Sequence, residues 1–150
     1  MIYQGKKRYP LTEVVLHTSA TTSDWWKGKD VNEMQDEIRR WHVEDRGWRD
    51  IGYARVFSPD GRMALGRSIY SIGAHVKGRN RGTIGICMIP IKTITKMGIV
   101  TDYYTDDQIY AVKHYIKELS ELTEIKKGSG HNDYANKLCP DFKVRSEDWL

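Results

Sequence analysis

Two short apolar runs constrain the fold more than any other feature of the chain. Residues 12–17 are rich in β-branched side chains, and residues 83–89 form a second apolar run. Short runs of this kind, bounded by polar clusters, are typical of strands buried within a sheet. The turn signal Pro59 to Gly61 lies between residues 54–57 and 63–66, so we expect these two segments to pair as a hairpin.

Two other segments repeat their apolar side chains at helical spacing. The first follows Asp30, which has a glutamate three positions on, and it should end at Gly47. The second follows Thr105, which has a glutamine three positions on, and it continues to Leu122. Each start resembles a capping box. We therefore predict an α/β fold over residues 1–150, a single domain whose central mixed sheet is flanked by helices.

The bulk properties are those of an ordinary globular protein. The chain has 150 residues and a net charge of +4, and its basic residues are spread along its length. No aromatic-rich basic strand appears, so we expect no nucleic-acid partner. No apolar run has the length of a membrane span, and residues 1–10 are polar and basic. We expect neither a membrane partner nor a signal peptide.

The C-terminal third concentrates groups that bind metals. His131 is followed eight positions later by Cys139, and Lys137 stands two positions before that cysteine. His17, at the end of the first apolar run, offers a third ligand. Two histidines and one thiolate can hold zinc and leave its fourth position open for water. A nearby lysine favours the thiolate form of a cysteine, whereas Cys87 lies in an apolar run and is predicted to be buried in the core.

Four segments occur in the order found in one protein family. They are residues 17–21 (HTSAT), 47–53 (GWRDIGY), 73–86, which contain GAH, Asn80 and TIGI, and 130–140, which contain GHND and KLCP. With these motifs the chain resembles the zinc-dependent N-acetylmuramoyl-L-alanine amidases of the phage lysozyme and peptidoglycan-recognition-protein family. The resemblance covers about residues 10 to 145. Ala54 and Arg55 depart from the family pattern, and residues 92–104 carry no family motif.

The resemblance implies a zinc site in a surface cleft at the strand ends, with His17, His131 and Cys139 as ligands. It implies that Lys137 stabilises the oxyanion formed during attack on an amide. A thiolate ligand makes zinc a weaker acid, and we expect Lys137 to compensate. Tyr53 is predicted to hydrogen-bond water or the tetrahedral species, because a phenol is a poor base at its ordinary pKa. The alternative is that Tyr53 has no catalytic role and only packs at the edge of the core.

The resemblance also places two polar residues near the cleft. We predict that His75 and Asn80 contact substrate, although a purely structural role for His75 is nearly as well supported. Asp133 either orients the neighbouring histidine ligand or caps the following turn. His42 and His114 fall on predicted helices away from the motifs, and we assign them no role.

The predicted function is hydrolysis of the amide between N-acetylmuramic acid and L-alanine in peptidoglycan. We expect a monomeric phage endolysin without a wall-binding domain, made in the host cytoplasm and acting on the periplasmic wall after release by another factor. The alternative to a phage endolysin is a bacterial effector that is exported by another route. A recognition module that binds peptidoglycan without cutting it is the alternative, but such relatives lack the cysteine ligand, whereas Cys139 is present. A nucleic-acid-binding protein with structural zinc would need a fourth ligand, and only Cys87 is spare.

Overall fold

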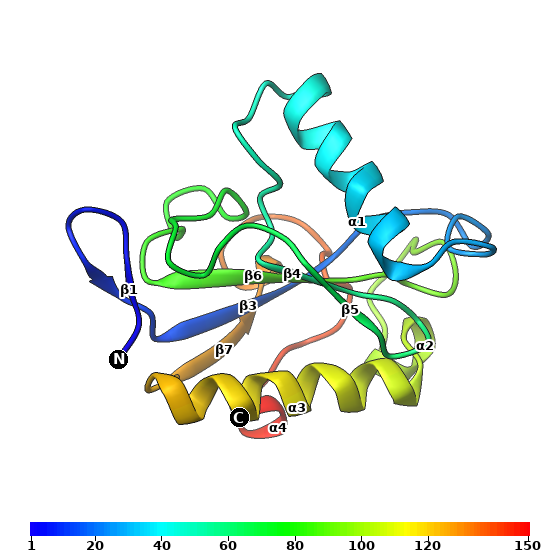
Figure 1. Cartoon of the computed structure of the whole chain (residues 1–150). Coiled ribbons are helices and arrows are strands. Elements are labelled where there is room, and N and C mark those ends of the chain that lie inside the picture. The colour runs from blue at the N-terminus through cyan, green and yellow to red at the C-terminus, as the bar shows by residue number, and fades with distance from the viewer.

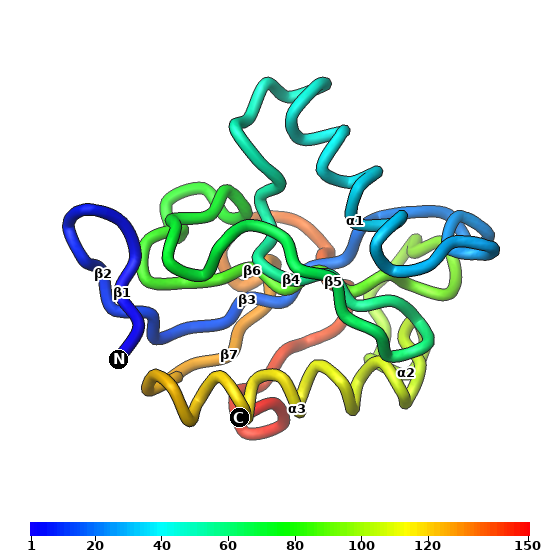
Figure 2. The backbone as a smooth tube through the Cα atoms, viewed as in Figure 1, coloured from blue at the N-terminus to red at the C-terminus, as the bar shows by residue number.

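The computed structural model describes residues 1–150 and is built around a five-stranded mixed sheet (Figures 1 and 2). The strands are β3 (Glu13–Thr18), β4 (Arg55–Phe57), β5 (Met63–Leu65), β6 (Thr83–Met88) and β7 (Lys127–Gly130). Their order across the sheet is β5-β4-β6-β3-β7. Only the β4–β5 pair is antiparallel. A separate two-stranded ribbon pairs β1 (Tyr3–Gln4) with β2 (Tyr9–Pro10).

The strands confirm the predicted pattern at the centre of the sheet. Every residue of β3 and β6 is buried, which explains why both read as continuous apolar runs rather than as alternating ones. The predicted hairpin is also present, with Val56 opposite Ala64. Gly61 in its turn has a φ of +84°, a conformation that glycine adopts without a Cβ clash.

The helices begin where their capping residues stand. The α-helices are α1 (Val31–Arg40), α2 (Val100–Tyr103), α3 (Asp106–Leu122) and α4 (Ser146–Trp149). A π-helical turn, η1 (Trp41–Asp45), extends α1, and a 3₁₀ turn, η2 (His131–Asp133), follows β7. The side chains of Asp30 and Thr105 accept hydrogen bonds from the third backbone N–H of α1 and α3, as predicted. No helix is both long and apolar enough to span a bilayer.

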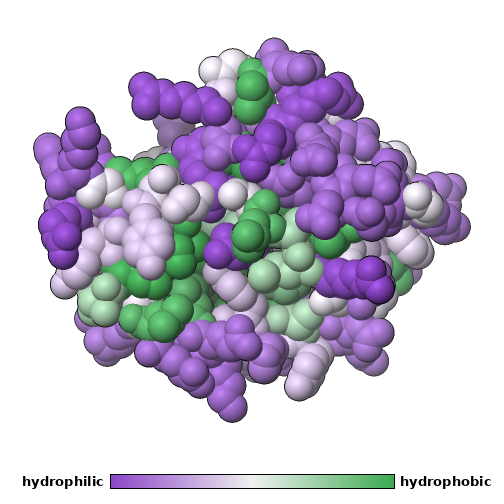
Figure 3. Space-filling model, in the orientation of Figure 1, coloured by the Kyte–Doolittle hydropathy of each residue, from purple (hydrophilic) through white to green (hydrophobic).

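The sheet separates two hydrophobic clusters of different size. Helix α3 runs along one face of the sheet, and α1 stands on the other (Figure 1). A cluster of 17 buried residues fills the α3 side, including Phe57 and Ile86. A cluster of eight fills the α1 side, including Val56 and Cys87. Cys87 is therefore a core residue, as predicted. On the outer surface, the face shown in Figure 3 is mostly hydrophilic with apolar patches in its centre and lower left, which is ordinary for a globular protein.

Parallel pairing brings two distant segments to one edge of the sheet. Strand β7 runs parallel to β3, with Leu16 opposite Gly130. The next residue of each segment is a histidine, His17 in β3 and His131 just after β7. The carboxyl ends of parallel strands are where open α/β sheets build their sites. The sheet thus fixes the relative position of two predicted ligands.

Candidate functional site

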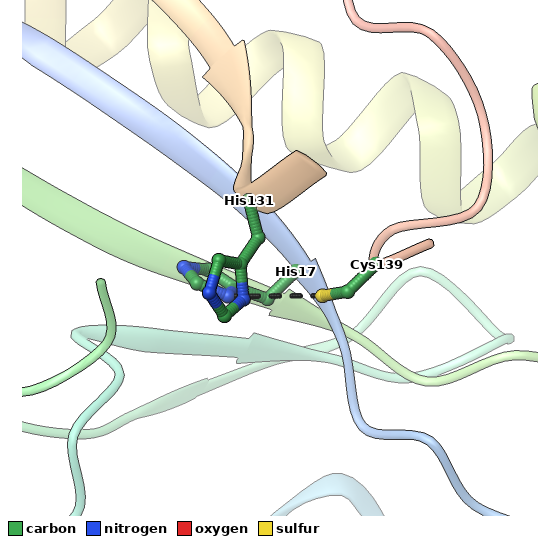
Figure 4. Close-up of side chains that lie close together, drawn as sticks. All are labelled: His17, His131 and Cys139. Carbon is green, nitrogen blue, oxygen red and sulfur yellow. Dashed lines mark hydrogen bonds between the residues drawn. The ribbon is translucent and has the colours of Figure 1, made fainter. Parts of the chain in front are cut away.

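Three predicted metal ligands converge at this edge of the sheet (Figure 4). The ligand atoms of His17, His131 and Cys139 all lie within 4.8 Å of one another. Nδ1 of His17 is 3.8 Å from the Cys139 sulfur, and the centroids of the two ligand imidazoles are 4.8 Å apart. The three side chains come from β3, from the start of η2 and from the loop after η2. Their proximity is the predicted arrangement.

The His17 ring contacts a second histidine on the side away from Cys139. Its side chain is 1% exposed, and its Nε2 lies 2.9 Å from Nδ1 of His75. The other nitrogen of His75, Nε2, is 3.0 Å from the hydroxyl of Thr83. The side-chain oxygen of Asn80 accepts hydrogen bonds from the backbone N–H groups of His75 and Val76, at 2.9 and 3.0 Å. Both ring nitrogens of His75 and the amide oxygen of Asn80 are thus engaged within the protein.

Cys139 is held by backbone hydrogen bonds from both sides of the site. The N–H of Thr18 donates to its sulfur at 3.2 Å, and the N–H of Asn132 donates to its carbonyl at 2.8 Å. The carboxylate of Asp133 accepts from the N–H of Gly130 at 2.9 Å, which closes the turn that carries the second histidine. Of the two roles considered for Asp133, this contact matches that of a cap.

The segment without a family motif braces the same loop. Within residues 92–104, the buried Tyr104 donates its hydroxyl hydrogen to the carbonyl of Pro140 at 3.0 Å. The N–H of Gly98 donates to the carbonyl of Asp141 at 2.9 Å. These contacts fall directly after Cys139 in the sequence. The segment therefore supports the loop that carries Cys139.

A cleft of about 860 Å³ opens onto two of the three predicted ligands. Tyr53, His75, Asn80 and Lys137 line it together with the ligands His131 and Cys139. Other lining residues are Thr18, Ser19, Ala20, Ile38, Trp41, His42, Arg46, Trp48, Ala74, Val76, Lys77, Tyr134 and Ala135. Three cations and no carboxylate contribute to the lining. The surface is therefore suited to anionic or polar groups and lacks a carboxylate acid or base.

The Tyr53 segment is fixed to the rest of the site by a partly buried arginine. Arg67 donates to the carbonyls of Ile51, Asp50 and Ile72, at 2.8, 3.0 and 2.9 Å. These bonds join the GWRDIGY segment to the residues just before the GAH segment. They place the Tyr53 ring with its centroid 5.1 Å from that of His17.

Burial sets the protonation of the site. Burial lowers the pKa of His17 well below its ordinary value and that of His75 to about 3. Burial, followed by the Lys137 charge, lowers the pKa of His131. Burial raises the pKa of the Cys139 thiol to about 12, although Lys137 acts in the opposite direction. The expected thiolate-favouring effect of Lys137 is thus present but smaller than the effect of burial.

His42 is a cleft residue that the sequence did not reveal. It is 8% exposed, and its Nδ1 accepts a hydrogen bond from the N–H of Gly52 at 2.9 Å. Its ring centroid is 4.7 Å from that of Trp48 and 5.4 Å from that of Tyr53. Burial lowers its pKa to about 4. The assignment of no role, on the ground that it lies away from the motifs, is wrong about its position, because η1 packs His42 against the Tyr53 segment.

Comparison with known proteins identifies the family. A model of the N-acetylmuramoyl-L-alanine amidase family matches residues 7–142. The endolysin of Klebsiella phage KP32 is 32% identical over 142 residues, which are 95% of this chain and 88% of that protein. The amidase LysC of Clostridium intestinale has the same fold, with a TM-score of 0.68, 20% identity and coverage of 99% of this chain and 93% of that one. The ectodomain complex of peptidoglycan recognition proteins LCa and LCx, solved with tracheal cytotoxin, matches with a TM-score of 0.71, 26% identity and coverage of 93% and 80%. The chain belongs to the family of N-acetylmuramoyl-L-alanine amidases.

Proposed function

We propose that the chain is a zinc-dependent phage endolysin that hydrolyses the amide between N-acetylmuramic acid and L-alanine, with His17, His131 and Cys139 as its metal ligands. The amidase class follows from family membership, and the endolysin role from relatives such as that of phage KP32. The observation that carries the metal site is the convergence of three ligand atoms within 4.8 Å at the edge of a cleft.

The ligand set fits zinc. Two imidazole nitrogens and one sulfur are ligands that zinc accepts in tetrahedral sites, and three protein ligands leave one position open. Burial keeps both imidazoles neutral at neutral pH, which is the form that binds a metal. The thiol must lose its proton on binding, and a divalent cation supplies the charge that stabilises the buried thiolate. Bound there, zinc supplies Lewis-acid chemistry and lowers the pKa of water.

Two side chains of the cleft carry the remaining roles. Lys137 is exposed at the cleft, and its charge reaches both histidine ligands. We assign it the stabilisation of the negative charge that develops on the amide oxygen. Burial raises the pKa of Tyr53 well above its ordinary value, so its phenol keeps its proton and acts as a hydrogen-bond donor. Contacts of His75 and Asn80 with substrate stay predictions.

The cleft lining favours amide hydrolysis over cleavage of the glycan. A glycosidase generally needs a pair of carboxyl groups flanking the scissile bond. No aspartate or glutamate lines this cleft. The presence of Cys139 among the converging ligands also favours an enzyme over a module that only binds peptidoglycan.

Digestion of purified sacculi tests this function directly. The zinc-loaded protein should release stem peptides with a free L-alanine amine and leave the glycan strands uncut, as mass spectrometry of the products would show. Removal of zinc by a chelator should stop release, and added zinc should restore it. New reducing sugar ends without free alanine amines would contradict the bond assignment. Binding to sacculi without any product would support the recognition-module alternative instead.

The monomeric state of the protein and its production in the host cytoplasm stay predictions.

A further inference from the structure

A continuous hydrogen-bond chain runs from a backbone carbonyl to the first ligand histidine. The Thr83 oxygen lies 2.6 Å from the carbonyl oxygen of Arg79 and 3.0 Å from Nε2 of His75. Nδ1 of His75 lies 2.9 Å from Nε2 of His17. The remaining nitrogen of His17, Nδ1, faces the sulfur of Cys139. Four groups from three segments are therefore joined in one line that ends at the metal site.

The chemistry of the groups gives this chain one direction. A carbonyl oxygen only accepts, and the Thr83 oxygen faces two of them, that of Arg79 at 2.6 Å and that of Asn80 at 3.2 Å. The Thr83 hydroxyl must therefore donate its single proton to a carbonyl, and the shorter contact selects Arg79. The hydroxyl then offers His75 only a lone pair, and Nε2 of His75 must carry the ring proton. A neutral imidazole has one N–H, so Nδ1 of His75 is an acceptor. Nε2 of His17 must therefore be the donor, which leaves its Nδ1 without a proton.

The opposite direction would disable the site. If Thr83 donated to His75, two oxygens that both present lone pairs would stand 2.6 Å apart at Arg79. His75 would then donate through Nδ1, and the proton of His17 would sit on the nitrogen that faces Cys139. A protonated ring nitrogen cannot bind a metal. The Arg79 carbonyl thus determines which tautomer His17 adopts.

We propose that Thr83 and His75 are positioning residues that fix the tautomer of His17 and hold its Nδ1 unprotonated towards Cys139 and His131. The proposal rests on His17 being a metal ligand, as proposed above. Thr83 makes no hydrogen bond to any of the three ligands. The proposal nevertheless implies that Thr83 affects the metal affinity of the site. It also gives both nitrogens of His75 a defined partner within the protein.

Two glycines form a slot that fixes the His75 ring for this role. A Cβ on Gly85, in the middle of β6, would lie 2.7 Å from Cγ of His75. A Cβ on Gly73 would lie 3.0 Å from Cδ2 of the same ring. Glycine inside a strand marks a place where another group approaches the backbone closely. The ring fills the space that these two glycines leave open.

The first test measures the tautomer in the zinc-free wild-type protein. Nitrogen NMR of the imidazole rings at neutral pH should show His17 protonated on Nε2 and His75 protonated on Nε2. Protonation of His17 on Nδ1 would overturn the proposal. This measurement requires no variant, no metal and no substrate. It therefore stands even if digestion of sacculi fails to show amidase activity.

The second test measures zinc affinity by competition with a chromophoric chelator. Thr83→Val removes the hydroxyl and keeps the β-branched shape. It should weaken zinc binding by about 10-fold, the lower end of the cost of losing a direct partner of a metal ligand, because Thr83 acts on His17 through His75. Thr83→Ser restores a hydroxyl and should bind zinc within a few-fold of wild type. The matched control is Thr123→Val, because Thr123 is also buried and donates to a backbone carbonyl, that of Leu11. Wild-type zinc affinity in Thr83→Val, or equal losses in Thr83→Val and Thr123→Val, would overturn the proposal.

Discussion

The two sides of the proposed metal site are built in different ways. His17 belongs to a central strand, is 1% exposed and is backed by a buried hydrogen-bond chain. Cys139 and Lys137 belong to an irregular loop, where Lys137 is exposed and Cys139 is half-buried. The loop is held by backbone hydrogen bonds and by Tyr104 rather than by a sheet.

This difference separates side chains that are held accurately from side chains that are accessible to substrate. Groups on strands are held more accurately than groups on loops, because their neighbours on both sides are fixed. A loop can present a lysine to solvent and substrate, which a central strand cannot. The strand side should therefore contribute to metal binding alone, whereas the loop side should contribute to both metal binding and turnover. Four variants test whether that division holds.

The largest effect is expected from Cys139→Ala. The variant loses the thiolate ligand and should retain much less zinc than wild type, with a loss greater than the roughly 10- to 100-fold that removal of an outer partner costs. Elemental analysis after dialysis measures zinc per chain, and digestion of sacculi measures activity, which should vanish. Full zinc retention would show that the loop supplies no ligand.

Lys137→Ala should separate turnover from metal binding on the same loop. Loss of one group that stabilises the oxyanion costs on the order of 100-fold or more in rate, because the charge on the amide oxygen develops only in the transition state. Zinc content and the melting temperature should stay at wild-type values. Lys137→Arg should recover only part of the rate, since a planar guanidinium places its charge differently.

The control for this variant is Lys117→Ala, which removes an exposed lysine from α3. It should leave turnover unchanged. Near-normal turnover of Lys137→Ala on purified peptidoglycan would transfer the oxyanion role to another group of the cleft.

His42→Asn tests the cleft wall through the pH dependence of stability. His42 titrates at its ordinary value of 6.5 when unfolded and at about 4 when folded. Between these values the unfolded chain binds more protons, so the free energy of unfolding should fall as the pH falls from 6.5 to 4. Asparagine can still accept from the N–H of Gly52 but does not titrate. The fall should be smaller in the variant by on the order of 1–2 kcal/mol, a value reduced for partial solvent screening. Denaturant titrations at several pH values measure it, and equal falls in both proteins would contradict the expectation.

Tyr104→Phe should give the smallest effect and is specific to the loop. It leaves the carbonyl of Pro140 without its buried donor, which should cost about 1 kcal/mol of stability. Zinc affinity should fall as well, because Cys139 directly precedes Pro140. Tyr103→Phe is the matched control, since that hydroxyl donates to the carbonyl of Lys96 instead. If both variants lose stability but neither loses zinc affinity, Tyr104 does not support the metal site.

The sequence predicts those parts of the molecule that depend on local pattern. The apolar runs at 12–17 and 83–89 become β3 and β6, and Asp30 and Thr105 cap their helices. The three proposed ligands lie far apart in the chain, and the family resemblance is what joins the motifs that contain them. Their convergence at one sheet edge follows from parallel pairing, which no local pattern reveals.

The features that the sequence missed depend on tertiary contacts. Residues 127–130 are Lys-Gly-Ser-Gly, which have low strand propensity, and they form β7 only because they pair with β3. A side chain at Gly130 would also collide, since its Cβ would lie 2.6 Å from the amide oxygen of Asn132. His42 was missed for a similar reason. The change from α- to π-helix at Trp41 alters the direction of the following side chains, and a regular helical period cannot show this.

The unequal clusters on the two faces of the sheet have a mechanical consequence. Helix α1 and η1 form one wall of the cleft. Helix α1 belongs to a cluster of eight buried residues, against which Trp41 of η1 packs, whereas α3 belongs to a cluster of 17. Elements with fewer buried contacts open at a lower free-energy cost, so amide hydrogens of α1 should exchange faster than those of α3. The substrate is a polymer of the bacterial cell wall. It cannot diffuse into a narrow site as a small molecule does. If α1 and η1 move away from the sheet, the cleft can widen around such a polymer. The β-strands that position the proposed ligands stay in place, because the larger cluster on the α3 side holds them.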